Sequence, residues 1–151
     1  EYLIEQVQRE SHTSGGNMTL NFNHPVKELI WAGTAVATTG LSTPVSLTAG
    51  TTYQLKLNGH DRFSARDYRY FTRTQVWQHH TGHGGVIKKD AIGVYSFALK
   101  PEEHQPSGTC NFSRIDNAQL VDSGTTSVNV YAVNYNVLRI MSGMGGLAYS
   151  N

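Results

Sequence analysis

The sequence predicts an all-β domain, an antiparallel sandwich or barrel of about eight strands with one short helix inserted. Charged residues make up only 15% of the 151 residues, well below the usual ~25%, which argues against a coiled coil or a charge-laced helical bundle. Thr, Asn and Tyr, which favour strands and turns, occur 15, 10 and 8 times. Short runs of alternating apolar and polar residues recur without long helices between them, so a parallel α/β sheet is excluded as well.

The strands are predicted from a side-chain period of two, which gives each run two distinct faces. The clearest alternation lies at residues 18–23, 53–58, 94–99 and 128–135. Further strands are predicted at Leu3–Gln8, Val26–Trp31, Phe112–Val121 and Leu138–Met141. Turn signals such as Asn58-Gly59 separate the runs, and the stretches 32–50 and 78–91 are predicted to be surface loops. The residues assigned to the core are Trp31, Phe97 and Phe112.

One segment breaks the strand pattern and predicts a short helix near residues 64–74. The side chains that recur there at helical spacing, behind a possible cap at Asp61, are Phe63, Tyr70, Phe71, Thr74 and Trp77. Four arginines fall along one stripe of the same helix, at Arg62, Arg66, Arg69 and Arg73. The stripe is interpreted as a solvated face or a contact between subunits. Phosphate binding by the guanidinium groups is the alternative.

Three histidines within five residues, His79, His80 and His83, form the most obvious candidate for a metal site. Neutral imidazoles are common metal ligands, and the residues available to complete the set are His104, Glu102 and Glu103. The spacing differs, however, from the H-x-H pair that cupin-type metal sites use. We therefore favour a polar loop here, and we expect no metal or other cofactor.

The remaining chemical candidates are a turn, a glycine-rich run and two sequons. The Ser107–Cys110 turn has no oriented base beside it apart from His104, and Cys110 is expected to be a small buried residue. Gly143–Gly146 lacks the Lys-Ser/Thr of a phosphate loop and is interpreted as a tight turn. Asn17 and Asn111 match the N-x-[ST] pattern for N-glycosylation. We therefore predict no catalytic residues and no enzymatic activity.

Charge and hydropathy restrict the partners that the chain can have. The net charge is +1, which leaves no electrostatic footprint for direct nucleic-acid binding. No run approaches the length of 18 apolar residues, so no transmembrane segment is predicted. The single cysteine excludes an internal disulfide and indicates a reducing compartment. The residues alone thus lead to a jelly-roll-like β domain without a convincing active site.

Long stretches of the sequence resemble one known family. The most specific stretch covers residues 95–118 and reads YSFALKPEEHQPSGTCNFSRIDNA. Four others agree with it in family order: EYLIEQ at 1–6, LNFNHP at 20–25, GHDRF at 59–63 and NVLRIMSGMGGLAYSN at 136–151. In these stretches the chain resembles the major capsid proteins of nucleocytoplasmic large DNA viruses, of the algal-virus and iridovirus type.

The resemblance implies a structural protein of the virion that is assembled in the host cytoplasm. Family members carry two jelly rolls in tandem, and three copies form a trimer with a six-fold-like outline. Residues 1–151 resemble the second, C-terminal jelly roll as a single domain, so an eight-stranded antiparallel jelly-roll sandwich is expected. The expected partners are further copies in a homotrimer, neighbouring capsomers and minor capsid proteins. The loops at 32–50 and 78–91 are expected to face the virion exterior and to be places for glycans.

Two other functions compete with this one. A lectin-like binding module would recognise host glycans through exposed loops, but residues 32–50 contain neither an aromatic residue nor a carboxylate. A cupin-like metalloenzyme would depend on His79, His80 and His83. Since the first jelly roll is missing from these 151 residues, we expect the chain alone to be monomeric or only weakly trimeric.

Overall fold

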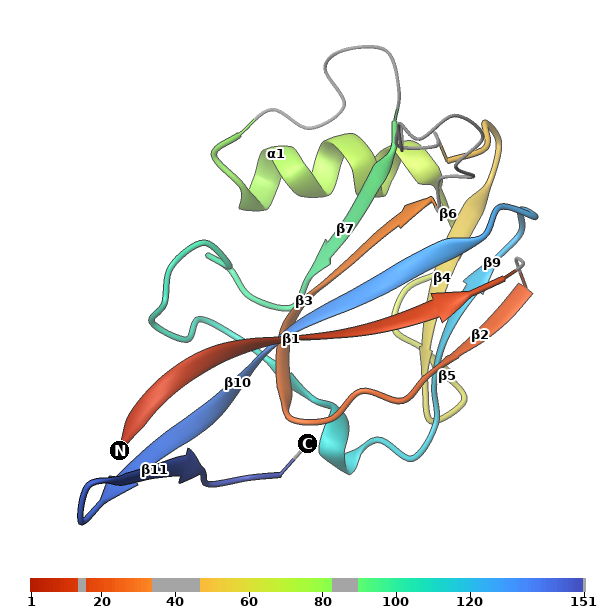
Figure 1. The fold of residues 1–151 in the computed structure, drawn as a ribbon. Coiled ribbons are helices and arrows are strands. Elements are labelled where there is room, and N and C mark those ends of the chain that lie inside the picture. The colour runs from red at the N-terminus through yellow and green to blue at the C-terminus, as the bar shows by residue number, and fades with distance from the viewer. Residues whose placement is uncertain (14–15, 34–46, 83–89, 151) are drawn as a thin grey trace, which may run out of the picture.

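The computed structural model describes residues 1–13, 16–33, 47–82 and 90–150, which form two packed antiparallel sheets (Figure 1). The first sheet has the order β1-β10-β3-β7, with bounds Tyr2–His12, Val128–Met141, Pro25–Gly33 and Ile92–Ser96. Two short strands extend it, β11 (Met144–Leu147) beside β10 and β8 (Cys110–Asn111) beside β3. The second sheet has the order β2-β9-β4-β5, with bounds Gly16–Leu20, Ala118–Asp122, Thr52–Leu57 and His60–Asp61. β6 (Arg66–Asp67) also pairs with β4.

The predicted jelly-roll sandwich is confirmed. Strands from opposite ends of the chain are neighbours, since β1 pairs with β10 from Tyr2 opposite Leu138 to His12 opposite Val128. The described residues contain eleven strands rather than eight. Three of them, β5, β6 and β8, have two residues each, which is too short for alternation to reveal.

Two of the predicted strands have different boundaries in the structure. The runs 128–135 and 138–141 are one strand, β10, whose pairing with β3 shifts at a bulge between Val133 and Asn134. The run 112–121 is wrong at its start, because Phe112–Arg114 form a 3-10 helix, η2. The Asn111 side chain stabilises this turn by accepting a hydrogen bond from the Ser113 N–H at 3.1 Å. The strand that follows, β9, begins only at Ala118.

The core between the sheets is centred on three aromatic rings. Trp31, Tyr53 and Phe71 are fully buried, and their ring centroids lie 5.1–5.9 Å apart. Phe112 is buried as well, 3% exposed, so two of the three predicted core residues, Trp31 and Phe112, are confirmed.

Phe97 is only partly buried and packs at the edge of the core, with its ring centroid 6.0 Å from that of Phe112. β7 ends at Ser96 instead of continuing to residue 99. The Ser96 hydroxyl causes the turn, because it accepts from the Ala98 N–H at 3.1 Å and donates to the Ala98 carbonyl oxygen at 2.7 Å. Phe97 therefore lies beyond the end of β7. The prediction that it is a core residue is only partly right, because its side chain packs against the core but is not fully buried.

The helix lies later in the chain than predicted. It consists of a π-helical turn, η1 (Tyr70–Thr74), and α1 (Gln75–His79), and it lies beside β7 (Figure 1). Residues 64–67 are not helical, because Arg66 and Asp67 pair with β4. Asp61 belongs to β5 and does not cap the helix.

Of the side chains predicted to recur at helical spacing, Phe71 is buried and Phe63 and Tyr70 pack against the core, whereas Thr74 is exposed. The buried side chains of the helix are Phe71, Thr72 and Gln75, and the Gln75 Oε1 accepts from the Ser96 N–H on the edge of β7 at 3.3 Å. Trp77, the last residue of the set predicted to recur at helical spacing, is 82% exposed. None of the helical segments in the described part of the chain has the length and apolarity needed to span a bilayer.

The two predicted surface loops fall largely outside the described residues. Residues 32–33 still belong to β3 and 78–79 to α1, whereas 34–46 and 83–89 are not described. Leu47, inside the first predicted loop, is buried and belongs to the core.

Candidate functional site

The start of β1 and the projecting β10–β11 hairpin form one end of the molecule (Figure 1). Seven of the exposed large apolar residues belong to the start of β1, to this hairpin or to the residues just after β11. We call this the terminal apolar surface and define it by Tyr2, Leu3, Ile140, Met141, Met144, Leu147 and Tyr149. Met144 and Met141 are 78% and 65% exposed. An ion pair between Glu1 and Arg139, at 2.7 Å, lies beside it. Neighbouring residues of a strand point to opposite faces, so these side chains lie on both faces of this end. An end of a domain with so many exposed apolar side chains and so little charge is typical of a contact with another protein.

The projecting hairpin follows from the local sequence. Met141 and Met144 are paired across a two-residue turn, and both turn residues, Ser142 and Gly143, have positive φ angles of 52° and 77°. Such turns match the right-handed twist of the flanking strands. The tight turn predicted at Gly143–Gly146 is thus present, although β11 already starts at Met144.

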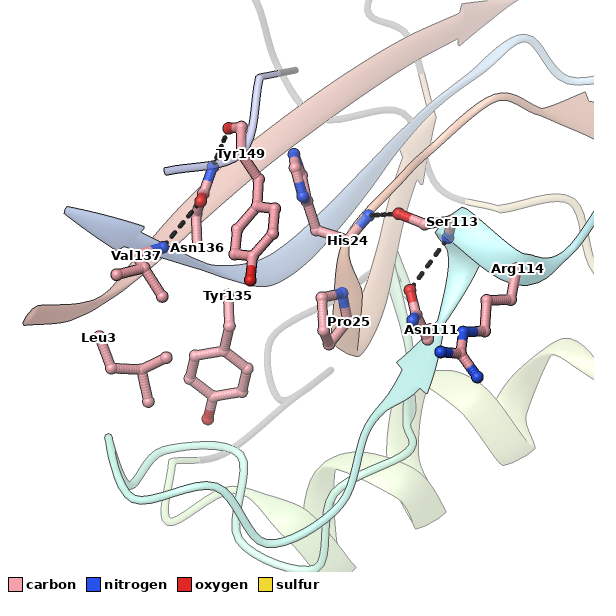
Figure 2. Close-up of a pocket in the computed structure, with 10 residues that line it drawn as sticks. All are labelled: Leu3, His24, Pro25, Asn111, Ser113, Arg114, Tyr135, Asn136, Val137 and Tyr149. Atoms are coloured by element: carbon pink, nitrogen blue, oxygen red, sulfur yellow. Dashed lines mark hydrogen bonds between the residues drawn. The ribbon is translucent and has the colours of Figure 1, made fainter. Parts of the chain in front are cut away.

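A cavity of about 410 Å³ opens next to this surface (Figure 2). Its apolar lining consists of Leu3, Pro25, Tyr135, Val137 and Tyr149, and its polar lining of His24, Asn111, Ser113, Arg114 and Asn136. Asn136 Nδ2 donates to the Tyr149 carbonyl oxygen at 2.8 Å and so holds the C-terminal tail against the cavity.

The polar side chains of the cavity mainly hold the backbone in place. The backbone N–H of His24, a residue with a φ of 66°, donates to the Ser113 hydroxyl at 2.8 Å. Burial raises the pKa of Tyr135, so its hydroxyl stays protonated and donates to the His104 carbonyl oxygen at 3.3 Å. This chemistry suits packing against an apolar group and offers little to a reaction.

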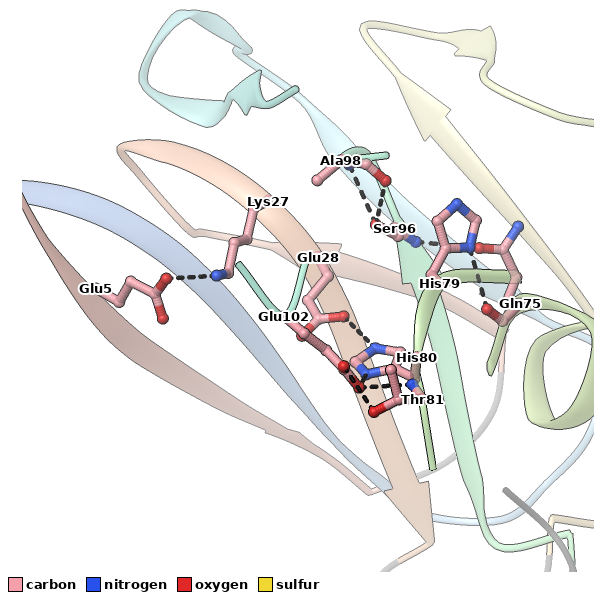
Figure 3. Close-up of polar contacts among 10 residues, drawn as sticks. All are labelled: Glu5, Lys27, Glu28, Gln75, His79, His80, Thr81, Ser96, Ala98 and Glu102. Carbon is pink, nitrogen blue, oxygen red and sulfur yellow. Dashed lines mark hydrogen bonds and ion pairs between the residues drawn. The ribbon is translucent and has the colours of Figure 1, made fainter. Parts of the chain in front are cut away.

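The histidines predicted as a possible metal cluster point to different partners. His79 Nδ1 lies 3.1 Å from the Gln75 carbonyl oxygen. The two ring nitrogens of His80 face the carboxylates of Glu28 and Glu102 (Figure 3). The structure therefore brings His80 and Glu102 together, as the metal hypothesis required. The contact is a direct hydrogen bond between a ring nitrogen and a carboxylate oxygen.

The other members of the predicted cluster lie apart from that contact. His104 Nδ1 is 3.6 Å from Glu5 Oε1, and Glu103 pairs with Lys100 at 3.8 Å. His83 lies outside the described residues. Within residues 1–13, 16–33, 47–82 and 90–150, no group of three or more His, Cys, Asp or Glu is placed to hold a metal ion.

The predicted arginine stripe is wrong. Arg62 and Arg66 precede the helix, and Arg66 stacks on the Tyr70 ring with its guanidinium carbon 4.8 Å from the centroid. Only Arg69 and Arg73 belong to the helical segment. The four side chains therefore do not share a helix face.

The two helical arginines are each engaged by a carboxylate. Arg69 Nε donates to Asp67 at 3.1 Å, and Arg73 donates to both oxygens of Asp90, at 2.9 and 2.8 Å. These hydrogen bonds lower the pKa values of Asp67 and Asp90. Guanidinium groups that are already paired this way are poorly placed to grip a phosphate.

The Ser107–Cys110 turn has a structural explanation. The Ser107 hydroxyl accepts from the Lys100 N–H at 2.9 Å. Cys110 lies in β8 opposite Val26 and is partly rather than fully buried. Burial raises the pKa of its thiol, which keeps the sulfur in its less reactive, protonated form.

Both sequon asparagines are exposed. Asn17 lies on β2 opposite Val121, and Asn111 lies in β8 and caps η2. Glycosylation at Asn17 and Asn111 stays a prediction, which peptide mass mapping of the protein from its natural source would check.

Sequence reasoning missed the terminal apolar surface. The available signal was the pair of apolar residues Ile140 and Met141 before a Ser-Gly turn, with Met144 directly after it. Apolar side chains so close to a tight turn project beyond the sheet, where nothing in the same domain can cover them.

The two packed sheets and the apolar projecting end define a jelly-roll structural domain. The family described as large eukaryotic DNA virus major capsid protein matches residues 1–146, and the chain belongs to this family.

Several relatives support the assignment. The major capsid protein of Pyramimonas orientalis virus is 51% identical over 100% of this chain and 43% of its own length. That of Paramecium bursaria Chlorella virus 1 is 40% identical over 100% of this chain and 49% of its own length. The crystal structure of PBCV-1 VP54, fitted into a cryo-EM reconstruction of the virophage Sputnik, matches with a TM-score of 0.82 at 35% identity. The match covers 99% of this chain and 51% of that one, so the chain spans about half the length of these relatives.

Proposed function

We propose that this chain is the second of two tandem jelly rolls in a major capsid protein that builds the icosahedral shell of a large double-stranded DNA virus. The observation that carries the proposal is the match to PBCV-1 VP54, with a TM-score of 0.82 over 99% of the chain. The half of that relative which the chain does not span corresponds to the first jelly roll in this proposal. The role is structural, in the virion, with assembly in the host cytoplasm and no catalytic step.

The shell unit in this proposal is a homotrimer that contacts neighbouring capsomers and minor capsid proteins. Contacts that close after three rotations give such a ring, and a two-sheet sandwich keeps most strand edges paired within the subunit. Charged residues are only 15% of the chain, so interfaces of standard size, about 800 Å² per partner, bury few unpaired ions.

Within that assembly, we assign the terminal apolar surface to a contact with a neighbouring copy of the capsid protein. Its seven apolar side chains are exposed on the single chain, and the charges beside it, Glu1 and Arg139, already neutralise each other. Burying this surface against a copy therefore removes apolar area from water without stranding a charge.

Light scattering tests the proposed assembly on two lengths of the protein. The two-jelly-roll protein is expected to be a stable trimer, and the 151-residue chain monomeric or weakly trimeric, because it lacks half of the contacts. A two-jelly-roll protein that remains monomeric at high concentration would contradict the shell-building role. A stable trimer from the shorter chain would show that this jelly roll holds most of the interface.

Charge placed on the hairpin tests the assigned surface separately. Met141→Glu combined with Met144→Glu, in the two-jelly-roll protein, is expected to shift the trimer to monomer without changing its melting temperature by more than a few degrees. Thr125→Glu, at an exposed position outside the terminal apolar surface, is the matched control and keeps the trimer. If the doubly charged variant still forms trimers, the surface is assigned wrongly, while the shell-building role keeps its own test.

A further inference from the structure

The strand β1 forms one edge of the first sheet. It spans Tyr2–His12, and within the described residues its one strand neighbour is β10, with which it keeps a single register over all eleven residue pairs. On the other side of β1, alternate backbone N–H and C=O groups point away from this ladder. In the described part of the chain, none of the backbone hydrogen bonds outside the ladders and helices involves β1. The outer edge of β1 is therefore open to another strand.

The opposite edge of the same sheet is covered. η1 and α1 lie beside β7 (Figure 1), and Gln75 Oε1 accepts from the Ser96 N–H on that edge at 3.3 Å. Among the described residues no helix lies along β1, and the strand contains neither a proline nor a bulge against β10. Proline and bulges are among the devices that keep a long edge strand from pairing with another chain. The regular edge of β1 therefore suits the addition of a strand from another chain.

The exposed face of β1 is complementary to itself in charge. From Leu3 to Ser11 every second side chain is exposed, and Glu5 and Arg9 flank Val7 on this face. When two β1 strands lie antiparallel with Val7 opposite Val7, Glu5 of each copy lies opposite Arg9 of the other, and directly opposite residues point to the same face. A slip of two residues removes both charge pairs, and a slip of four sets Glu5 against Glu5 or Arg9 against Arg9. The charges therefore favour one antiparallel register.

Glu5 and Arg9 can each take a further partner. Glu5 Oε1 accepts from Lys27 Nζ and lies 3.6 Å from His104 Nδ1, while Oε2 has no hydrogen-bond partner among the described residues. Arg9 donates from Nη2 to the Asn129 amide oxygen at 3.3 Å, and it has no carboxylate partner in the described part of the chain. The two charges are therefore available to pair between copies.

We propose that β1 pairs with β1 of a second copy, antiparallel and centred on Val7, so that the first sheets of the two copies form one continuous sheet. The contact is isologous, because each copy contributes the same strand about a two-fold axis. Val7, which is 64% exposed on the single chain, meets its counterpart on that axis. A contact between two strand edges is small beside the roughly 1,000 Å² of a stable interface, so the pair is weak in solution.

Two-fold pairing gives the protein a contact of a different kind from the one assigned to the terminal apolar surface. A contact that closes after three rotations is used up within the trimer, whereas a two-fold contact joins one trimer to the next. Many weak contacts of this kind act together in a shell. This joining role rests on the proposed function, but the strand pairing depends only on β1 and is expected whether or not the protein forms trimers.

Disulfide cross-linking of the full-length protein tests the pairing. Val7→Cys sets two thiols opposite each other, with Cα atoms about 4.5–5.5 Å apart, within the roughly 4.4–6.8 Å that a disulfide spans. Ser11→Cys is the matched control on the same exposed face, because the proposed register holds its two copies about 26 Å apart along the strands. On mild air oxidation, Val7→Cys is expected to form a covalent dimer several times faster than Ser11→Cys or the parent protein.

Two further measurements test the register. A mixture of Leu3→Cys and Ser11→Cys is expected to form the mixed disulfide, because Leu3 of one copy lies opposite Ser11 of the other. Arg9→Glu, added to Val7→Cys, sets like charges opposite each other and is expected to slow the cross-linking several-fold.

Met141→Glu combined with Met144→Glu separates this pairing from the trimer contact, and it is expected to leave the cross-linking rate of Val7→Cys unchanged. Four outcomes would overturn the pairing. They are cross-linking of Val7→Cys no faster than that of Ser11→Cys, absence of the mixed disulfide, a rate that Arg9→Glu does not change, and loss of the cross-link in the doubly charged hairpin variant.

Discussion

The indole of Trp31 lies directly against Gly93, its cross-strand partner in the β3–β7 ladder. A Cβ atom at Gly93 would come within 2.5 Å of the ring atoms Cε2 and Nε1 of Trp31. Trp31 is fully buried among other rings and cannot move aside. A glycine is therefore required at this point of β7, even though glycine weakens a strand.

Gly93→Ala is expected to lower the free energy of unfolding by about 1–3 kcal/mol, because it overpacks the core. Urea unfolding followed by tryptophan fluorescence measures the change. Gly146→Ala is the matched control, since a Cβ there meets nothing within 4 Å. Equal stability of the two variants would mean that the Trp31 ring does not occupy the space above Gly93.

Truncating the core aromatics is expected to separate buried from edge positions. Trp31→Ala and Phe112→Ala should each cost about 3–5 kcal/mol, a large share of a typical stability of about 5–15 kcal/mol. Phe97→Ala should cost less than either, because Phe97 is only partly buried. Urea titration of the three variants gives the order, and a loss below about 1 kcal/mol for Trp31 or Phe112 would contradict their burial.

Asp122 makes the stability depend on pH. Its side chain is buried, Oδ1 accepts from the Gly124 N–H at 2.6 Å, and Oδ2 has no hydrogen-bond partner among the described residues. Burial raises its pKa, so the folded state binds the proton more tightly than the unfolded chain does. Proton binding by Asp122 therefore stabilises the folded state. This contribution is fully present below the ordinary Asp pKa of about 3.9 and is lost as the pH rises through the raised pKa of the folded state.

Asp122→Asn removes this titration and keeps an oxygen for Gly124. The variant is expected to be more stable than the parent by about 1–2 kcal/mol at neutral pH, with the difference shrinking as the pH falls toward 4. Urea unfolding at several pH values measures it, and Asp116→Asn, at an exposed position, is expected to show no such trend. A variant less stable than the parent at neutral pH would show that the ionised carboxylate is stabilising.

Metal removal is expected to have no effect on folding. His79, His80 and His104 each contact a different protein oxygen, so chelator treatment should leave the melting temperature unchanged. A chelator-dependent drop of several degrees that His80→Ala abolishes would instead point to a structural metal.

Alternation in the sequence predicted the strands whose two faces see different surroundings. β4 is an example, because Tyr53 and Leu55 face the core while their neighbours are less buried. The helix boundary could not be predicted the same way. It depends on the pairing of Arg66 and Asp67 with Thr52 and Tyr53, a contact between segments that no local pattern contains.

The contacts of His80 were beyond sequence reasoning for a related reason. The adjacent histidines and Glu102 suggested a shared site, but Glu28 lies 52 positions away from His80 and is an ordinary strand residue in the sequence. Only the placement of α1 beside β7, the neighbour of β3 in the sheet, brings these groups together. The capsid resemblance, in contrast, rested on long matching stretches and needed no tertiary information.

Cryo-electron microscopy of the virus particles that contain this protein tests the shell-building role most directly. We predict capsomers with density for three copies of the β1–β11 sandwich, each with its terminal apolar surface buried against a neighbouring copy. A shell whose repeating density does not accommodate this sandwich would contradict the account.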